Sequence, residues 1–555
     1  MNFTRFQILL VCACFAMLLH DASVLAQARR KAGRDTLRNF QPLPDRWQDV
    51  KPPPYELNVK GHLHDPYNQN VLKGDFPIMG ESVFMILTAS TENFVEAFSV
   101  PTPSAVSTAR AQNAGFFGGG NRMFFNENLT FSLEFYKGNT AFKPRDFEIK
   151  IMPVINLNYI NTQENNDVNI NVRQGTSRYD SHLGFRELFM EKHLFNLSRR
   201  YDFVSLKAGI QFLNSDFRGF IFQDANFGGR LFGSAASNRY QYNLAYFRML
   251  EKDTNSEQNT VFQNRNQDVF LANLYKQDFL TPGYTAQVSL HYNHDKPSVY
   301  VDNNGVPVRP AIFGSAVPHD IKAYFVGWTG DGHWGRLNIN HAFYQVVGRD
   351  SFNPLAGRPI TINAQMAALE LSLDKDWMRF KVSAFYASGD ANPLDGKGTG
   401  FDTIIDLPFF AGGAFSYWNS QKIRLLGVNL TNKFSLVPDL RSSKFEGQSN
   451  FVNPGLLLFN FGYQADLTPK LRFVLNSNYL RFANTSSLAQ FVNQRNIGQD
   501  IGLDYGLGVL YRPFLNNNAA ITVAFTGLTP FSGFNDLYES AGTQFSFSTS
   551  LVLTY

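Results

Sequence analysis

The sequence has little cysteine, little charge and no long apolar run, and each shortage excludes a class of protein. Cys12 and Cys14 are its only cysteines among 555 residues, so the chain beyond residue 14 holds no disulfide and no thiolate metal site. Charged residues make up 17% and the formal net charge is +4, which does not favour nucleic-acid binding. No apolar stretch reaches the roughly 18 residues of a membrane helix.

The longest apolar run, residues 8–19, lies at the start of the chain. It follows a short segment with Arg5 and precedes two small-residue motifs, Val24-Leu25-Ala26 and Ala26-Gln27-Ala28. A basic start, a short apolar run and a small-residue cleavage site are the parts of a secretory signal peptide. We therefore assign residues 1–28 to a signal peptide, whose removal takes away both cysteines.

Residues 29–80 form a polar, proline-containing region. It begins with Arg29-Arg30-Lys31 and contains Pro52-Pro53-Pro54, and few apolar residues recur at a regular spacing within it. We expect a periplasmic N-terminal extension or a partial plug here, which could contact a periplasmic partner.

From residue 81 onward the chain alternates apolar and polar residues. In the last thirteen residues Phe545, Phe547 and Leu551 alternate with Ser546 and Ser548, and the chain ends in an aromatic residue. Successive side chains of a strand point to opposite faces, so one face is apolar and the other polar. The same period recurs in residues 129–136, 147–159, 284–293, 471–479 and 501–512. Such segments are typical of bacterial outer-membrane barrels.

The connections between these segments are either short or long. Short ones lie at 196–199, 280–283, 330–335, 374–376, 467–470 and 513–518, and long ones at 91–127, 161–182, 295–319, 389–422, 483–498 and 528–543. Outer-membrane barrels have tight periplasmic turns and longer outer loops. We predict an all-β fold, a transmembrane antiparallel β-barrel over residues 81–555 in outer-membrane lipid. Its strand number is even, about 18 (range 16–20), with residues 226–235 and part of 437–452 counted as strands or absorbed by loops.

If the apolar faces meet lipid, the polar faces line a wet lumen that tolerates charge. This predicts nine pore-lining cations: Lys150, Lys207, Arg336, Lys375, Arg379, Lys381, Arg424, Arg472 and Arg512. Rings of fixed charge select solutes of the opposite sign, so we expect a preference for anionic solutes. Arg379 and Lys381, beside Lys375, form the predicted selectivity patch. The alternative is that each charge pairs with a neighbour and holds the wall.

One long loop is rich in aspartate. Asp390, Asn392, Asp395, Asp402 and Asp406 supply the hard oxygen ligands that calcium prefers. Their spacing is not that of an EF-hand, and aspartate, asparagine, glycine and proline are also the residues of ordinary solvated turns. A calcium site and an ordinary turn both remain open, and no other cofactor is expected.

A second loop, residues 214–224, carries Asp216 and Arg218 among aromatic residues. These two side chains can pair and hold the aromatic residues over the pore mouth, or the loop can fold onto the outer rim. Signals of an enzyme are few. His182 and His294 lie at strand–loop junctions without a nucleophile elbow or an HExxH helix, so we expect no enzyme, with a rim-located hydrolase as an alternative.

Three groups of residues carry a resemblance to a known family. They are Tyr386-Ala-Ser-Gly-Asp390 with Asp395-Gly-Lys397 and Gly400-Phe-Asp402, then Gly209-x-Gln211 leading into Ser215-Asp-Phe-Arg218, and Arg424-Leu-Leu-Gly-Val428. Over roughly residues 120–555 the chain resembles the alginate-export family of outer-membrane channels, although Ile210 stands where that family has arginine. The resemblance implies an 18-stranded channel with a cationic constriction that passes an acidic polysaccharide outward.

The predicted function is therefore a porin-like channel of the bacterial outer membrane. Its solutes are hydrophilic and anionic, either small molecules or an exported acidic polysaccharide. The alternative is a barrel that acts through its surface, as a loop-based adhesin or as the docking barrel of a periplasmic export complex.

Overall fold

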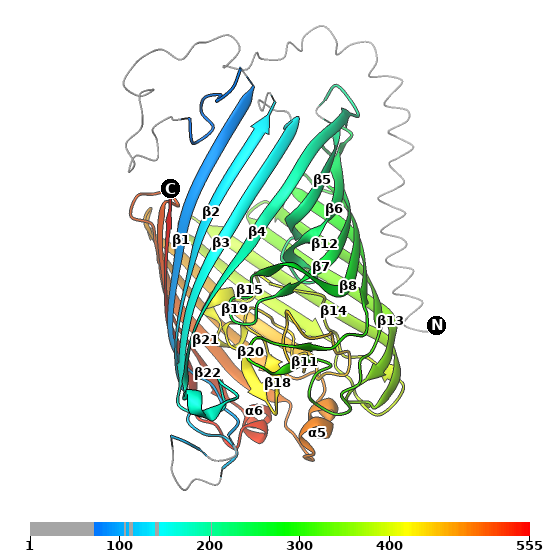
Figure 1. Ribbon diagram of the computed structural model, residues 1–555, viewed down its shortest axis with the longest axis vertical. Helices are drawn as coiled ribbons and strands as arrows, with labels where there is room; N and C mark the ends of the chain where they lie inside the picture. The colour runs from blue at the N-terminus through cyan, green and yellow to red at the C-terminus, as the bar shows by residue number, and fades with distance from the viewer. Residues whose placement is uncertain (1–70, 81, 105–106, 110–114, 139–143, 201) are drawn as a thin grey trace.

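The computed structural model describes residues 71–80, 82–104, 107–109, 115–138, 144–200 and 202–555 (Figure 1). The predicted signal peptide, and the predicted extension as far as residue 70, lie outside the described residues. No helix in the described ranges is long and apolar enough to cross a membrane.

Within the described residues, eighteen strands form the wall of one closed antiparallel barrel. They are β1 (Val83–Ser99), β2 (Asn121–Lys137), β3 (Phe147–Thr162), β4 (Ser177–Asn196), β5 (Phe203–Asn214), β6 (Gln223–Ala235), β7 (Tyr240–Lys252), β8 (Asn259–Lys276), β9 (Tyr284–Asp295), β12 (Ile321–Trp334), β13 (Leu337–Asn353), β14 (Arg358–Lys375), β15 (Met378–Ala387), β19 (Leu456–Thr468), β20 (Leu471–Arg481), β21 (Asp500–Tyr511), β22 (Ala519–Pro530) and β23 (Gln544–Thr554). Each pairs with the next, and β23 pairs with β1, with Ser90 opposite Thr554. The predicted fold and strand number are confirmed.

The uncertain segments of the prediction divide between wall and loop. Residues 226–235 belong to β6, whereas 437–452 contribute no wall strand in the part of the chain that the structure describes. A two-residue strand, β16 (Lys397–Gly398), adds a parallel pairing to β14. The six predicted short connections lie at one end of the barrel and the six predicted long ones at the other (Figure 1), as expected from the sequence. Two further short connections, 253–258 and 354–357, lie at the end with the long loops.

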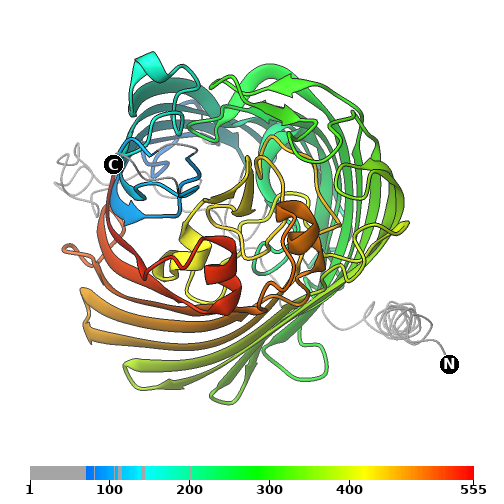
Figure 2. The same ribbon diagram turned by 90° about the horizontal axis from the view of Figure 1, so that it is seen from below.

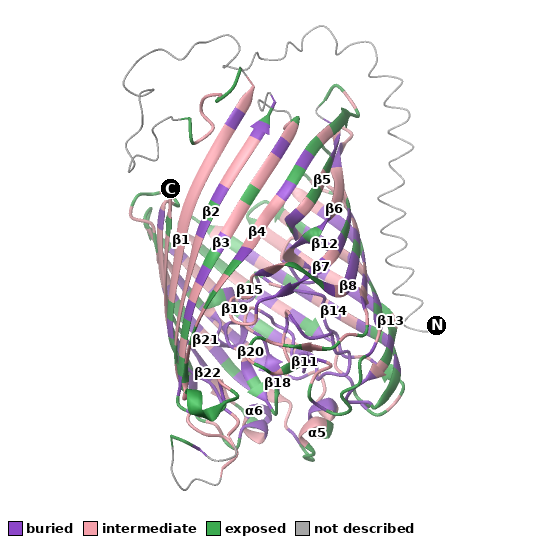
Figure 3. Ribbon diagram, in the orientation of Figure 1, coloured by how far each residue is buried: buried purple, intermediate pink, exposed green. Residues whose placement is uncertain are grey.

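The alternation of side chains gives the wall two different faces (Figure 3). In β23, Phe547 is 50% exposed whereas its neighbour Ser546 is 3% exposed. In β15, Val382 is 53% exposed and Ser383 is 6% exposed. In these strands the apolar side chain is turned outward, because water is absent from the lipid side, and the polar one is turned into the lumen. In β12 to β14 the inward face is also apolar, with Phe325, Val346 and Ile362 buried in the core inside the barrel.

The buried core lies inside the barrel. Residues 388–455 leave β15 and fold into the lumen, where they form η3 (Gly413–Phe415), α4 (Tyr417–Ser420) and the hairpin of β17 (Ile423–Leu425) and β18 (Val428–Thr431). Figure 2 shows these segments within the ring of strands. Tyr417 and Trp418 have no exposed surface. We call residues 388–455 the lumen loop.

Smaller elements occupy the other long connections. They are η2 (Val172–Gln174), β10 (Tyr300–Val301), β11 (Pro307–Arg309), α5 (Ser486–Val492) and α6 (Ser532–Leu537). The first three lie between wall strands β3 and β4 or β9 and β12, whereas α5 lies between β20 and β21 and α6 between β22 and β23. All of them therefore belong to the end of the barrel with the long loops.

The wall is taller on the side of β1 to β4, whose strands rise above the end of β23 in Figure 1. Tyr555 exchanges two backbone hydrogen bonds with Ala89, and the first residues of β1 extend beyond this point. There the N–H of Leu87 donates to the carbonyl of Leu72 at 2.7 Å, and Lys73 forms a bridge with Ile86. The described end of the predicted extension, residues 71–80, thus lies along the edge of β1.

Candidate functional site in the lumen

A cavity of about 1330 Å³ lies in the lumen between the inner face of the tall wall and the loops. Strands β1 and β2 contribute Phe94 and Phe124, and the lumen loop contributes Arg424 and Lys433. Loop residues between β9 and β12, such as Asn304, also contact it. The cavity is thus enclosed partly by rigid wall and partly by loops.

The lining carries charges of both signs in nearly equal number. Seven are basic (Arg122, Arg178, Arg186, Lys252, Lys422, Arg424 and Lys433) and eight are acidic (Glu92, Glu96, Asp167, Glu187, Asp224, Glu257, Asp302 and Glu446). Rings of one sign select strongly for the opposite sign, and this mixed lining is not such a ring.

Many of these charges are held by partners. Asp167 lies 2.9 Å from Arg122 and 3.4 Å from Arg424, and Arg186 lies 3.0 Å from Glu92. These pairs join two loops, a loop and the wall, or two wall strands. They fix the shape of the cavity more than they attract a solute, because each charge is already neutralised nearby.

Three lining charges, Arg178, Asp302 and Glu446, form no ion pair with another described residue. The Thr254 hydroxyl donates a 2.8 Å hydrogen bond to Glu446. Burial and the negative charge of Asp302 raise the pKa of Glu446 to about 7. The hydrogen bond from Thr254 and the positive charge of Lys422 oppose this rise and are outweighed. Burial likewise raises the pKa of Asp302. The loops therefore meet at a buried carboxyl group that holds its proton more tightly than a free glutamate.

Comparison with known proteins gives weak matches to channels of known structure. A scan against protein-family models finds no match, and neither does a search of curated proteins. Among solved structures, Pseudomonas aeruginosa OccK9 (OpdG) is 11% identical with a TM-score of 0.47, over 85% of this chain and 98% of that one. Acinetobacter baumannii OccAB4 is 11% identical (TM-score 0.44; 86% and 99%), and the outer-membrane protein opdK of P. aeruginosa is 9% identical (0.44; 84% and 99%).

The wall itself decides the class of this protein. Its strands close into a ring, so their ladder hydrogen bonds are made within the sheet, and large apolar side chains such as those of Leu369, Val382 and Phe547 are exposed on the outer face, which is the combination that lipid requires of a spanning sheet. The chain is a bacterial outer-membrane β-barrel. Its lumen is the candidate functional site.

Five of the nine predicted pore cations lie on inward faces of barrel strands: Lys150, Lys207, Arg379, Lys381 and Arg472. Four of them are paired. Lys150 lies 2.7 Å from Glu187, and the other three ion pairs join Lys207 to Glu191, Arg379 to Asp374 and Arg472 to Asp466. Lys381 has no ion pair within the described ranges, and it shares its face with buried Ser383.

The other four predicted pore cations lie elsewhere. Arg336 is exposed in the two-residue turn between β12 and β13, and Arg512 follows the last residue of β21. Lys375, the last residue of β14, shares the outward face with Leu373, which is 46% exposed, because the two are two positions apart. Arg424 lines the cavity from the β17–β18 hairpin of the lumen loop and not from the wall.

The predicted selectivity patch is therefore divided. Arg379 and Lys381 share the inward face of β15, whereas Lys375 points away from them. The sequence alone does not give the pairing of β14 with β15. The face on which a residue at the end of a strand lies depends on the register set by the turn between the two strands.

The loop 215–222 is folded into the barrel and does not lie on the outer rim. Asp216 accepts hydrogen bonds from the backbone N–H groups of Arg218 (2.8 Å) and Gly219 (2.6 Å) and from the hydroxyl of Tyr344 (2.8 Å). The Arg218 guanidinium pairs instead with Glu370, at 2.7 Å. The expected pairing of the Asp216 and Arg218 side chains is therefore wrong, because the guanidinium reaches Glu370 and Asp216 is occupied by backbone N–H groups and Tyr344.

The five predicted calcium ligands do not form one cluster. Asp390 accepts from the N–H groups of Asn392 and Thr399, and Asp395 accepts from that of Lys397. No group of three or more His, Cys, Asp or Glu side chains among the described residues is arranged to hold a metal ion. Calcium binding by this loop stays a prediction.

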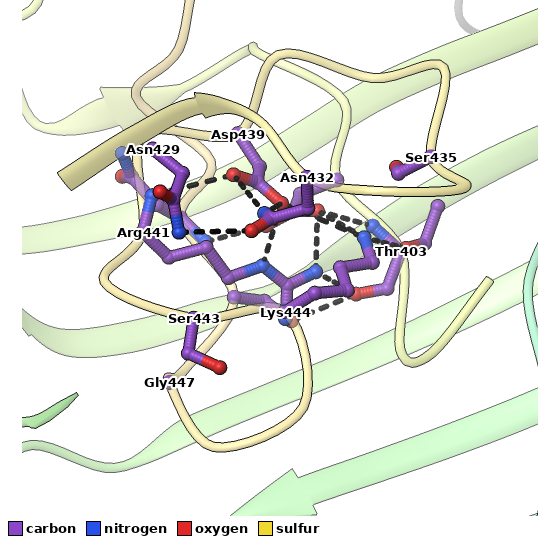
Figure 4. A network of polar contacts seen from close by, with 12 residues as sticks. Thr403, Asn429, Asn432, Ser435, Asp439, Arg441, Ser443, Lys444 and Gly447 are labelled. Atoms are coloured by element: carbon purple, nitrogen blue, oxygen red, sulfur yellow. Dashed lines mark hydrogen bonds and ion pairs between the residues drawn. The ribbon is translucent and has the colours of Figure 1, made fainter. Parts of the chain in front are cut away.

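Asp402 and Asp406 instead belong to a buried network of charges that holds the lumen loop together. Figure 4 shows Asp439, Arg441 and Lys444 of this network close to one another. Arg441 lies 2.7 Å from Asp402 and 3.0 Å from Asp439, and Lys444 lies 2.5 Å from Asp406. The five side chains are at most 2% exposed. Burial raises the pKa of Asp439 to about 6, and the three carboxylates raise that of Arg441.

The two histidines considered as candidate catalytic residues have structural contacts. His182 lies 3.2 Å from the carbonyl of Asn259 and 3.6 Å from Asp253. His294 lies 2.8 Å from Asp320. These contacts join neighbouring loops and strands, and none of them brings a nucleophilic hydroxyl to the imidazole.

Proposed function

We propose that the barrel is a channel through which small hydrophilic solutes cross the outer membrane. The observation that supports this best is the cavity of about 1330 Å³, which lies in the lumen and is lined by charged and amide side chains together with aromatic and aliphatic ones. A cavity of this volume accepts a molecule of the size of a small ligand. The buried lumen loop restricts the passage, which favours small solutes over a polymer.

The anion preference expected from the sequence rests on fewer residues than the nine predicted cations. Four of the five on inward strand faces are paired, and the cavity lining is mixed in sign. Lys381 supports a weak preference for anions. Export of an acidic polysaccharide, which the family resemblance implies, needs the lumen loop to leave room for a chain of sugar acids.

Single-channel recording with engineered cysteines tests the proposal. In a protein that begins at residue 29, and so lacks Cys12 and Cys14, a single introduced thiol is the one reactive site. Asn304→Cys places the thiol at the cavity, and Leu369→Cys places it on the outward face, where Leu369 is 43% exposed. We expect discrete current steps from both variants in planar bilayers.

A bulky charged methanethiosulfonate reagent distinguishes the two thiols. It should reduce the conductance of Asn304→Cys and leave that of Leu369→Cys unchanged, because only the first thiol faces the cavity. Absence of current steps, or equal effects on both variants, would contradict the proposed channel.

A further inference from the structure

The ammonium group of Lys433 lies among three aromatic rings in the lumen cavity. Its Nζ is 4.6 Å from the centroid of Phe94, 5.1 Å from that of Phe124 and 5.4 Å from that of Phe434. The carboxylate of Glu96 lies 3.5 Å from the same atom. We call Phe94, Phe124, Phe434 and Glu96 the ammonium cage.

Most of the cage belongs to the rigid wall, whereas its occupant belongs to a loop. Phe94 and Glu96 are two positions apart on the inward face of β1, and Phe124 is on β2, with ring centroids of the two phenylalanines 6.3 Å apart. Lys433 lies in the lumen loop after β18. Lys433 can therefore leave while three members of the cage stay in position.

Glu96 is held in place without help from Lys433. The Gln421 amide and the Ser546 hydroxyl each donate a 2.6 Å hydrogen bond to it, and it is 3% exposed. Aromatic faces attract ammonium groups because the ring quadrupole is negative at its face, and a nearby carboxylate adds to the attraction. Rings and a fixed carboxylate together recognise an organic cation.

The two other lysines of the cavity are held differently. Lys252 pairs with Asp224 at 2.6 Å and donates to Asn259 at 2.8 Å, and Lys422 pairs with Glu257. The contact between Lys433 and Glu96, at 3.5 Å, is longer than these, and its side chain is 17% exposed. Among the three, Lys433 is the lysine whose place a soluble ammonium group can take.

We propose that the ammonium cage binds the amine or quaternary ammonium group of a small organic cation, and that Lys433 is the internal occupant which this cation displaces. The inference rests on the proposed channel, because the cage opens on the lumen cavity. It assigns a class of solute, organic ammonium compounds, for which the predicted pore cations gave no indication.

Titration of the full chain in detergent with tetramethylammonium chloride tests the cage. Binding is measured by calorimetry and by broadening of the probe's proton resonance, neither of which requires ion conduction. Lys433→Met removes the occupant and leaves Glu96 unneutralised, so we expect about tenfold tighter binding than in the unchanged protein, equivalent to about 1.4 kcal/mol. Lys422→Met is the matched control and should leave the affinity unchanged, because Lys422 is not among the rings.

Two further variants keep the proposal falsifiable. Phe124→Leu combined with Lys433→Met should lose the gain in affinity, because a leucine offers no ring face. If Lys433→Met fails to fold, Glu96→Gln in the otherwise unchanged chain should weaken probe binding several-fold, since the amide keeps an acceptor for Gln421 and Ser546 but loses the charge.

The outcomes separate the cage from the channel. Equal affinity in the unchanged protein and Lys433→Met, or retention of the gain in Phe124→Leu, would overturn the cage. Tight binding of the probe by Lys433→Met in a protein that conducts no current would support the ammonium cage and contradict the proposed channel.

Discussion

Lys73 lies over the ring of Tyr555, with its Nζ 4.0 Å from the ring centroid, so the first described segment meets the last residue of the chain. The contact lies at the seam where β23 ends and residues 71–80 continue along the edge of β1. An unpaired edge is a liability for a sheet, and this segment pairs with part of it. The seam is thus closed by backbone hydrogen bonds and by a cation over an aromatic ring.

Replacing the terminal ring should weaken the seam. Tyr555→Ala keeps the backbone bonds to Ala89 and removes the contact with Lys73, so we expect the free energy of unfolding to fall by about 1 kcal/mol. Urea unfolding in detergent measures it. Tyr511→Ala, at the end of β21 where no cation lies over the ring in the described structure, is the control. Equal losses in both variants would show that the Lys73 contact contributes nothing.

The buried charges of the lumen loop should be far more sensitive to substitution than the exposed pairs of the wall. Arg441→Met leaves Asp402 and Asp439 buried without their main partner, and breaking such a pair costs about 3–5 kcal/mol. We expect a loosened lumen loop, seen as noisier single-channel current and faster protease cleavage within residues 388–455. Arg472→Met breaks a pair with Asp466 in which both side chains are about 40% exposed, and should cost less than about 1 kcal/mol. Similar behaviour of the two variants would argue against a structural role for the network.

Attachment of the lumen loop should weaken as the pH rises toward neutrality. Burial raises the pKa of Glu446 from its usual 4.5 to about 7, so the folded loop binds this proton more tightly than the unfolded one. The stabilisation is complete below about pH 4.5, is lost as the pH rises to 7, and changes no further above that. Asp439, with its pKa raised to about 6, acts in the same direction at lower pH. Protease cleavage of the loop should therefore be faster at pH 8 than at pH 6.5.

Glu446→Gln isolates the contribution of this one carboxyl group. The amide can still accept the hydrogen bond from Thr254 but has no charge to gain, so the difference in cleavage rate between pH 6.5 and pH 8 should largely disappear. If the variant keeps the full pH dependence, another group is responsible.

The wall of this barrel could be predicted from the sequence because its signal is local. Alternation of Phe545, Ser546 and Phe547 identifies a two-faced strand without knowledge of any other residue. The lumen could not be predicted in the same way. Lys433 meets Glu96 across 337 positions of the chain, and nothing near either residue indicates the other. Such contacts depend on how a long loop folds inside the closed wall.

Arg424 and Lys375 show where a local pattern is not enough. Arg424 lines the lumen cavity, but it does so from a short hairpin within the lumen loop and not from the wall. Lys375 was grouped with Arg379 by closeness in sequence, and the register of the turn between β14 and β15 separates their faces. The alternation of apolar and polar residues thus identifies strands. The position of a strand in the barrel, and the face on which its last residue lies, depend on which strands pair and in which register.

Ion selectivity should respond to Lys381, the predicted inward-facing wall cation that has no ion pair among the described residues. Removing a paired cation also exposes its acidic partner, and removing Lys381 leaves no such partner among the described residues. In a gradient of potassium chloride, Lys381→Met should move the reversal potential toward cations by several millivolts, because the lumen loses an uncompensated positive charge. Lys381→Arg keeps the charge and should behave like the unchanged channel. If Lys381→Met leaves the reversal potential where it was, the mixed charges of the cavity set the selectivity, and the preference for anions expected from the nine predicted cations has no remaining support in the wall.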